Sequence, residues 1–172
     1  IHPHINLTLT GYRLLRNGQI IWWSERTGYG AYYLYDRNGK ELRQLTSGRE
    51  LVAAHIVHID ERAGTLTFAA YGGGSGNPYY RKYYQVGLNG KGQRCLTPDE
   101  ADHELELAPS GEVGLLTTSR MDLPPRYSTL ALKGRSGAHL FDSIPRSMLE
   151  AAGWQAPELV RVLSADGRTP LY

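Results

Sequence analysis

The chain is built from short runs of hydrophobic, aromatic and β-branched residues, and each run is closed by a polar turn. The run Ile20–Ser24 follows Asn17-Gly18, and the run Ala31–Tyr35 leads into Asn38-Gly39. Runs of about 4–8 residues bounded in this way are typical of β-strands, and Asn-Gly supplies the positive φ angles that tight hairpins need. The pattern therefore predicts an all-β fold.

Helical spacing of apolar residues is almost absent until the segment 144–153. There Ser143 is a candidate N-cap, Pro145 lies in the first turn and Gly153 marks the end. We therefore expect one short helix near the C-terminus.

The predicted strands repeat along the chain. The turn glycines Gly18, Gly64 and Gly111 are separated by 46 and 47 residues, and the strand-ending pairs Leu45-Thr46 and Leu96-Thr97 are 51 residues apart. Four strands per unit at a period of about 40–50 residues is the pattern of β-propeller blades. We therefore expect a partial β-propeller of about three four-stranded antiparallel blades. A β-sandwich with accidental spacing shares the short strands and stays open as an alternative.

The predicted strands, unit by unit, are Tyr12–Leu15, Gln19–Ser24, Ala31–Asp36 and Leu42–Thr46; His55–Asp60, Thr65–Ala70, Lys82–Leu88 and a strand ending at Thr97; and His103–Ala108, Glu112–Thr118 and Ser128–Lys133. A closed propeller has roughly four to eight blades, so three units predict a part of a larger ring. The first residue, Ile1, is not Met, which agrees with a processed or excised piece.

Composition narrows the class of protein. The chain has 172 residues, is 41% hydrophobic and carries a net charge of +2, which excludes a disordered chain. Its basic residues are scattered, which argues against a nucleic-acid partner, and it has no apolar run of about 18 residues for a membrane span. The single cysteine, Cys95, excludes an internal disulfide and a cysteine-based zinc cluster.

The sequence gives little support for a nucleophilic catalytic site or a metal site. Two segments approach the G-x-S-x-G motif of α/β-hydrolases, Gly73–Asn77 and Gly134–Ala138, but both lie between predicted strands and lack the last glycine. The histidine pairs are His2 with His4 at the terminus, and His55 with His58 three apart on a predicted strand, facing opposite ways. We therefore assign no catalytic, metal-ligating or cofactor-binding residue and expect no cofactor.

Three further segments have a functional and a structural interpretation. The glycine-rich stretch 71–78 lacks the following helix of a phosphate loop, so we interpret it as a loop between the second and third strands of a blade. The run Tyr79–Tyr84 could stack on sugars or bases, but tyrosine is also an ordinary strand residue. An acidic cluster lacks the EF-hand pattern and is interpreted as a solvated turn; its members are Asp99, Glu100, Asp102, Glu104 and Glu106.

Several motifs, in order, resemble the N-terminal propeller of the dipeptidyl peptidase IV family. They are Trp22–Gly30 with Tyr33–Asp36, Gln44–Gly48, Leu88–Gly92 with Leu96-Thr97, His103 with Ala108–Gly111, Gly153–Glu158, and Ser164–Tyr172. The resemblance covers roughly Gln19 to Tyr172. It departs from the family at Asn89 and Ser110, where Asp is usual, and at Arg49-Glu50.

The resemblance implies a part of a prolyl oligopeptidase family serine exopeptidase that releases dipeptides. In that family the propeller caps an α/β-hydrolase domain, so the catalytic Ser, Asp and His are expected beyond Tyr172. The family's paired glutamates, which hold the substrate's amino terminus, have no counterpart here because the chain contains no adjacent Glu pair. On this basis residues 1–18 are a lead-in with the first strand, 19–142 the blades, and 143–172 a helix and linker strand toward the hydrolase domain.

Two functional hypotheses follow. In the first, the chain is a non-catalytic wall that gates and shapes access of peptide substrates in a longer parent, with the hydrolase domain and the remaining blades as partners. In the second, it is a free-standing propeller-like or sandwich binding module for sugars or proteins, suggested by the Tyr79–Tyr84 run and the glycine-rich stretch 71–78. Unpaired sheet edges also predict self-association, and the resemblance implies a periplasmic or secreted location.

Overall fold

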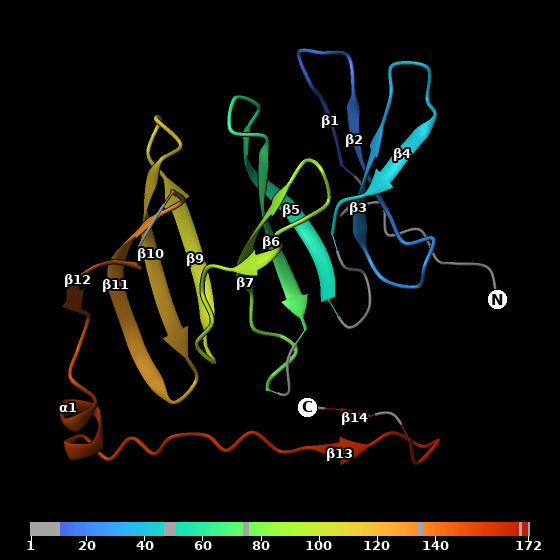
Figure 1. The fold of residues 1–172 in the computed structure, drawn as a ribbon. Helices are drawn as coiled ribbons and strands as arrows, with labels where there is room; N and C mark the ends of the chain where they lie inside the picture. The colour runs from blue at the N-terminus through green and yellow to red at the C-terminus, as the bar shows by residue number, and fades with distance from the viewer. Residues whose placement is uncertain (1–10, 47–50, 74–75, 134–135, 169, 172) are drawn as a thin grey trace.

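The computed structural model describes residues 11–46, 51–73, 76–133, 136–168 and 170–171. Within them it contains three four-stranded antiparallel sheets side by side (Figure 1), so the predicted all-β, propeller-like fold is confirmed. The sheets are β1 Tyr12–Leu14, β2 Ile20–Ser24, β3 Ala31–Tyr35 and β4 Glu41–Gln44; β5 Leu51–Asp60, β6 Thr65–Gly72, β7 Lys82–Gly87 and β8 Arg94–Cys95; and β9 Asp102–Leu107, β10 Val113–Arg120, β11 Leu123–Ala131 and β12 Ser136–Asp142.

Each sheet is a meander in which every strand pairs with the next one in sequence. The connecting turns use the glycines that the sequence placed there: Gly18 has φ 83° and Gly90 has φ 76°. Glycine adopts this left-handed conformation without the steric cost that a Cβ imposes. The turns that suggested the repeat therefore connect neighbouring strands of the same sheet.

Two strands, β5 and β11, begin four and five residues earlier than predicted. β5 begins at Leu51 rather than His55, and its pairing with β6 shifts register between Ala53 and Ile56. β11 begins at Leu123 rather than Ser128 and includes Pro124 and Pro125. Prolines cannot donate a ladder hydrogen bond, and here they coincide with a register shift of β10 between Thr118 and Arg120. Such irregularities break the alternation from which strands are recognised.

The predicted helix forms as α1 Arg146–Ala151. The prediction that Ser143 caps it is wrong, because Pro145 occupies the N-cap position and no side chain caps the helix. The predicted end is confirmed: Gly153 has φ 86°, and the Trp154 N–H donates to the Leu149 carbonyl at 3.0 Å.

The repeated Leu-Thr pairs have a structural cause. The hydroxyl of Thr46 accepts the Tyr32 N–H at 2.9 Å, and the hydroxyl of Thr97 accepts the Tyr83 N–H at 2.9 Å. Both threonines are buried, with 1% and 2% of their surface exposed. Since buried backbone N–H groups need an acceptor, the threonine at the end of each of the first two units satisfies one where regular pairing stops.

The sheets pack face to face through two interfaces. In the first interface the sheet β1–β4 contacts the sheet β5–β8, and the buried core includes Ile21, Trp23, Tyr32, Leu34, Leu51, Ala53, Leu66, Phe68, Ala70 and Val86. In the second interface the sheet β5–β8 contacts the sheet β9–β12, around a smaller core of Ala54, Ala69, Tyr83, Leu116, Leu130 and Leu132. The middle sheet is therefore covered on both faces, and the outer sheets each have one covered face.

After α1 the chain runs beneath all three sheets (Figure 1), and it ends in the paired strands β13 Val162–Leu163 and β14 Pro170–Leu171. Among the described residues, no helix is long and apolar enough to span a bilayer. The last segment of the chain thus lies across one end of every sheet.

Candidate functional site

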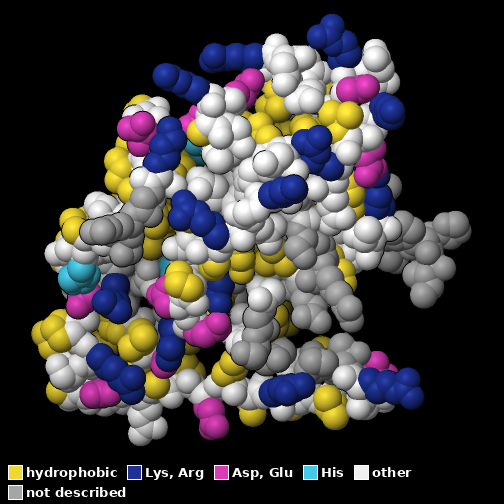
Figure 2. All heavy atoms as spheres, viewed as in Figure 1, with side chains coloured by type: hydrophobic (Ala, Val, Ile, Leu, Met, Phe, Trp, Pro, Cys, Tyr) yellow, Lys and Arg dark blue, Asp and Glu magenta, His cyan; other side chains and the backbone are white. Residues whose placement is uncertain are grey.

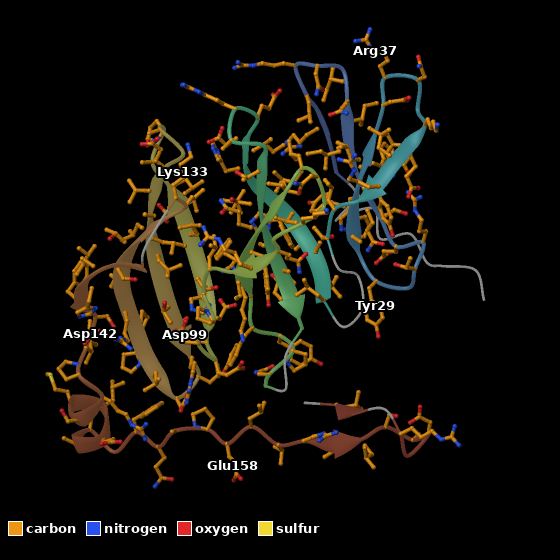
Figure 3. The ribbon with its side chains drawn as sticks, in the orientation of Figure 1. Tyr29, Arg37, Asp99, Lys133, Asp142 and Glu158 are labelled. Atoms are coloured by element: carbon orange, nitrogen blue, oxygen red, sulfur yellow. The ribbon has the colours of Figure 1, made fainter. Side chains whose placement is uncertain are left out.

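The end of the sheets that faces the C-terminal segment carries the most varied chemistry. A pocket of about 440 Å³, here called the lower pocket, opens between the connections of the second and third sheets and the C-terminal segment. Figure 3 shows Glu158 on that segment, below the sheet ends. The pocket is lined by Gly76, Asn77, Tyr80, Glu100, Arg120, Met121, Asp122, Pro157, Glu158 and Leu159.

One wall of the lower pocket is the β6–β7 connection packed on the β8–β9 connection. Lys82, the first residue of β7, lies with only 10% of its side chain exposed and donates to Glu100 at 2.6 Å. Gly76 packs so closely on the Glu100 carboxylate that a Cβ at this position would clash with it. The glycine-rich stretch therefore lets the backbone approach a carboxylate that belongs to this protein.

The opposite wall is the β10–β11 hairpin. The Arg120 guanidinium donates through Nε to Asp122 at 2.7 Å, and a second contact through its terminal nitrogen makes the pair bidentate. The hydrogen bond from Arg120 lowers the pKa of Asp122, and the same bond raises the pKa of Arg120. Both groups thus stay charged across the physiological range.

Beside the pocket, a polar cluster connects the second sheet to the third. The Arg81 N–H donates to Asp102 at 2.8 Å, and its guanidinium also contacts that carboxylate at 3.4 Å. The ring of His103 is completely buried and lies between the Arg81 carbonyl and the Asp99 carboxylate, 3.2 Å from each. The polar groups of this cluster satisfy one another inside the interface.

The lower pocket and the polar cluster beside it can anchor and select a ligand by charge and shape. Lys82, Arg120 and Arg81 are each neutralised by a carboxylate within 4 Å, while Met121 and Leu159 add exposed apolar surface, 77% and 54%. Hydrophobic side chains also recur along the C-terminal segment at the bottom of Figure 2. Within the described ranges, no three His, Cys, Asp or Glu side chains come together as metal ligands.

The acidic cluster was interpreted as a solvated turn, and the structure gives it more specific roles. Asp99, Glu100 and Asp102 contact His103, Lys82 and Arg81 respectively. The Asp99 and Glu100 side chains nevertheless stay 62% and 49% exposed, and Glu104 and Glu106 of β9 are exposed as well. No sequence signal identified the partners of Glu100 and Asp102, since Lys82 and Arg81 are 18 and 21 residues away. Asp99 and His103 are only four residues apart.

The remaining sequence candidates lie apart from one another. The glycine-rich loop joins β6 and β7, the second and third strands of their sheet, as predicted, although Gly74 and Ser75 lie outside the described residues. His2 and His4 also lie outside them. The pKa of His55 is lowered by partial burial and by Arg81, and the ring of His58 packs on Gly111.

The Tyr79–Tyr84 run does not form one continuous surface. Tyr79 is 63% exposed, Tyr83 is 1% exposed, and strand β7 begins only at Lys82. Because Arg81 and Lys82 are both ion-paired, the run lacks the free cations that a polyanion site needs.

Comparison with known proteins gives a consistent picture. The model of the "Dipeptidyl peptidase IV (DPP IV) N-terminal region" family matches residues 4–125. Dipeptidyl peptidase 4 from Porphyromonas gingivalis is similar over 82% of this chain and 19% of its own, with a TM-score of 0.67 and 21% identity. A candidate dipeptidyl aminopeptidase IV from Bacteroides ovatus is similar over 89% of this chain and 24% of its own, with a TM-score of 0.69 and 22% identity.

A more distant likeness is to a solved structure from a study of two prolyl endopeptidases, with a TM-score of 0.58 at 9% identity, over 80% of this chain and 20% of that one. These solved structures share the fold, and the chain spans about a fifth to a quarter of their length. The family match covers more than half of the 172 residues. The chain therefore belongs to the dipeptidyl peptidase IV N-terminal region family.

Proposed function

We propose that this chain is a non-catalytic, propeller-like part of a dipeptidyl peptidase IV-like serine exopeptidase, in which it walls the substrate chamber and restricts access to short peptides. The observation that carries the proposal is the family match over residues 4–125 on a chain whose three sheets are propeller-like. Peptide substrates would then reach a hydrolase domain supplied by a longer polypeptide.

The C-terminal segment supports a second domain on this side of the sheets. Val160, Val162 and Leu163 are 67%, 56% and 58% exposed, and β13 and β14 have two residues each. A two-stranded pair is at best marginally stable alone in water, and apolar side chains on it favour burial against another layer. In our proposal residues 143–172 lead into the hydrolase domain and the lower pocket faces it.

The ion pairs at the lower pocket suit a wall better than a reaction centre. Their charges are fixed by partners at 2.6–3.4 Å, so they define shape and polarity while leaving chemistry to residues elsewhere. Restriction of access would then depend on the three sheets staying packed against one another.

The proposal is tested by comparing this chain with the longer polypeptide that contains it. We expect the longer polypeptide to release X-Pro dipeptides from a chromogenic substrate and the 172-residue chain to have no such activity. Peptidase activity of the isolated chain that survives stringent purification would overturn the proposal.

The gating role has its own test in the longer polypeptide. Trp23→Ala opens the first interface, whereas Leu42→Ala, 37% exposed on β4, serves as control. We expect Trp23→Ala to raise cleavage of a long unfolded polypeptide relative to a tripeptide, because a loosened wall admits larger chains. An unchanged ratio would argue that access is set elsewhere.

The alternative of a free-standing binding module has less support. It depended on the Tyr79–Tyr84 run and the glycine-rich stretch 71–78. In the run one tyrosine is buried and both basic residues are ion-paired, and in the stretch Gly76 packs on the Glu100 carboxylate of this chain.

A further inference from the structure

The turns at the end of the sheets opposite the C-terminal segment, here called the upper end, gather basic side chains that are scattered along the sequence. This end is formed by the turns β1–β2, β3–β4, β5–β6, β7–β8, β9–β10 and β11–β12 (Figure 1). Figure 3 shows Arg37 and Lys133 there, and Figure 2 shows Lys and Arg side chains projecting at this end. The described residues of these turns include the basic Arg16, Arg37, Lys40, Arg62, Lys91 and Lys133, and the acidic Asp36, Glu61 and Glu112.

The turns at the lower end have the opposite balance of charge. Their described residues include the basic Arg26 and Arg81, and the acidic Glu25, Asp99, Glu100 and Asp122. The fold therefore separates charge between the two ends of the sheets, although the net charge of the whole chain is only +2.

The cations of the two ends also differ in their partners. At the lower end Arg81, Lys82 and Arg120 each contact a carboxylate. At the upper end Lys133 is paired with Asp60 at 2.6 Å. The other upper cations have no carboxylate within 4 Å of their side-chain nitrogens among the described residues; they are Arg16, Arg37, Lys40, Arg62 and Lys91. Unneutralised charges of one sign on one face attract ions of the opposite sign.

Most carboxylates at the upper end are engaged in holding the turns. Asp36 accepts the N–H groups of Asn38 and Lys40 at 2.9 Å each. Glu61 accepts the backbone N–H of Arg16 at 2.9 Å, so the Arg16 guanidinium stays available to another anion. Glu112 is the exception, because its exposed carboxylate has no hydrogen bond or ion pair with a described residue.

A pocket of about 300 Å³, here called the upper pocket, opens among these turns. Arg16, Arg62 and Lys133 line it from turns of the first, second and third sheets. Contacts between the sheets hold these turns in place, since the Arg16 N–H bonds to Glu61 and Lys133 bonds to Asp60. A pocket that is already held in shape loses less entropy when a ligand binds.

The side chains at the upper end narrow the class of anion. Among the described residues of these turns there is no exposed aromatic or large aliphatic side chain. The upper end therefore lacks the stacking surface of a single-stranded nucleic-acid site and the apolar side chains that enter a membrane interface. His58, Gln85 and Ser110 also line the upper pocket, and such groups can form hydrogen bonds with a carboxylate beside the guanidinium groups.

We propose that the upper end binds acidic peptide segments, with one carboxylate in the upper pocket beside Arg16 and Arg62 and others on the unpaired cations of the neighbouring turns. The inference rests on the proposed function in one respect, that the longer polypeptide acts on peptides, and there the upper end draws acidic peptides toward the chamber. The partners in that proposal leave this end free, because the remaining blades adjoin the outer sheets and the hydrolase domain adjoins the lower end.

The test measures binding of a fluorescent, blocked, glutamate-rich peptide to the 172-residue chain by fluorescence anisotropy. The same peptide with glutamine at each glutamate position is the comparison. We expect the glutamate peptide to bind at least about tenfold more tightly at low ionic strength. Raising the ionic strength from about 0.01 M to about 0.1 M shortens the screening length from about 30 Å to about 10 Å, and should weaken this binding by at least about fivefold.

Charge variants locate the binding site. Arg16→Glu and Arg62→Glu should each weaken binding by at least about fivefold, because a carboxylate replaces an unpaired cation at the upper pocket. Glu112→Gln should strengthen binding by about twofold, because it removes a free carboxylate there. Arg168→Glu makes the same charge change on the C-terminal segment and should bind as the unmodified chain does. All four side chains are exposed, so folding should be retained, and circular dichroism checks this.

The inference is overturned if the glutamate and glutamine peptides bind alike, or if Arg168→Glu weakens binding as much as Arg16→Glu and Arg62→Glu do. It is also overturned if phosphatidylglycerol vesicles or duplex DNA bind the chain more tightly than the acidic peptide, since the upper end would then serve another polyanion.

A second measurement separates this inference from the proposed function. In the longer polypeptide we expect kcat/KM for X-Pro peptides with an acidic tail to exceed that for neutral ones at low ionic strength, and Arg62→Glu to remove the difference. Cleavage without this preference would overturn the inference and leave the proposed function standing. Absence of any cleavage would contradict the proposed function, and the anisotropy result would then decide the inference by itself.

Discussion

The two interfaces between the sheets occupy equivalent places but are built from different chemistry. In the first interface the indole of Trp23 fills the space beside Gly30 and donates to the Ala53 carbonyl at 2.7 Å. In the second interface Ala69 stands at the position of Trp23. The corresponding backbone bond confirms the match, because Ala53 N–H donates to Gly30 and His103 N–H donates to Arg81.

The comparison shows that side-chain volume has moved from one partner to the other. The first interface has a large Trp23 against small Gly30 and Ala53. At the corresponding positions the second interface has a small Ala69 and large Arg81 and His103. A Cβ at Gly30 would lie within 2.5–2.9 Å of the Trp23 ring, so the glycine is a direct requirement of the tryptophan. Protein interiors are close-packed, and a repeated fold therefore conserves the filled volume at an interface rather than the residues that fill it.

The largest effect is expected in the first interface, where the buried side chain is the apolar Trp23. Trp23→Ala should lower the free energy of unfolding by about 3–5 kcal/mol, because it empties the site and leaves the Ala53 carbonyl without its donor. Chemical denaturation at low protein concentration measures it. Trp22→Ala is the control, because Trp22 is 47% exposed whereas Trp23 is 2% exposed. An equal loss of stability in both variants would contradict the assignment of the buried core to Trp23.

The second interface is tested through His103. His103→Ala should cost about 2–3 kcal/mol in the free energy of unfolding, because the buried ring leaves a cavity and the Arg81 carbonyl loses a partner. Asp99→Asn should cost less, since the Asp99 side chain is 62% exposed. If Asp99→Asn proves as costly as His103→Ala, the charge rather than the volume of the ring carries the interface.

A matched pair of hydroxyl deletions compares the two interfaces directly. Tyr32→Phe removes a donor to a carbonyl, whereas Tyr83→Phe removes the acceptor of the Leu105 N–H. Each should cost about 1 kcal/mol, with Tyr83→Phe the more costly, because orphaned buried N–H groups are tolerated less than under-satisfied carbonyls. The reverse order in denaturation midpoints would show that the Leu105 N–H finds another acceptor.

The smallest expected effect concerns pH. Lys133, in the connection between β11 and β12, donates to Asp60 of β5 at 2.6 Å, and this bond is the main reason that the pKa of Asp60 falls from 3.8 to about 2. A pKa lowered by folding stabilises the native state above the unfolded value and is lost as the pH drops through the folded value. The stability difference between the unmodified chain and Asp60→Asn should therefore shrink between about pH 4 and 2. A constant difference would show that the pair contributes no charge-dependent stability.

Much of the fold was predictable because its signals are local. Asn17-Gly18 and Asn38-Gly39 specify turns through the residues they contain, and the Leu-Thr pairs mark strand ends because Thr46 and Thr97 satisfy a neighbouring N–H. The early start of β5 was not predictable, because its register shift near Ala53 interrupts the alternation of buried and exposed positions.

The ion pairs at the lower pocket could not be predicted from the sequence. Asp102 and Arg81 are 21 residues apart, and Glu100 and Lys82 are 18 apart, so their pairing depends on how two connections meet at a sheet end. The correspondence between the large Trp23 in the first interface and the large His103 in the second could not be predicted either, because it depends on the strand register of both sheets. The cluster of acidic residues was therefore interpreted as a solvated turn, and the structure shows that three of its members also form ion pairs.

The meander order of the strands has a consequence for synthesis on the ribosome. Hairpins form within about 1–10 μs, whereas elongation adds about 5–20 residues per second, so each sheet can complete before the next has emerged. The inner face of the first sheet nevertheless stays exposed until the second sheet has been synthesised, because the apolar core of the first interface contains residues from Leu15 to Val86. Until Val86 has left the exit tunnel, a nascent chain displays Trp23 and Ile21 to solvent, and chaperone binding to ribosome-bound chains should peak in that interval.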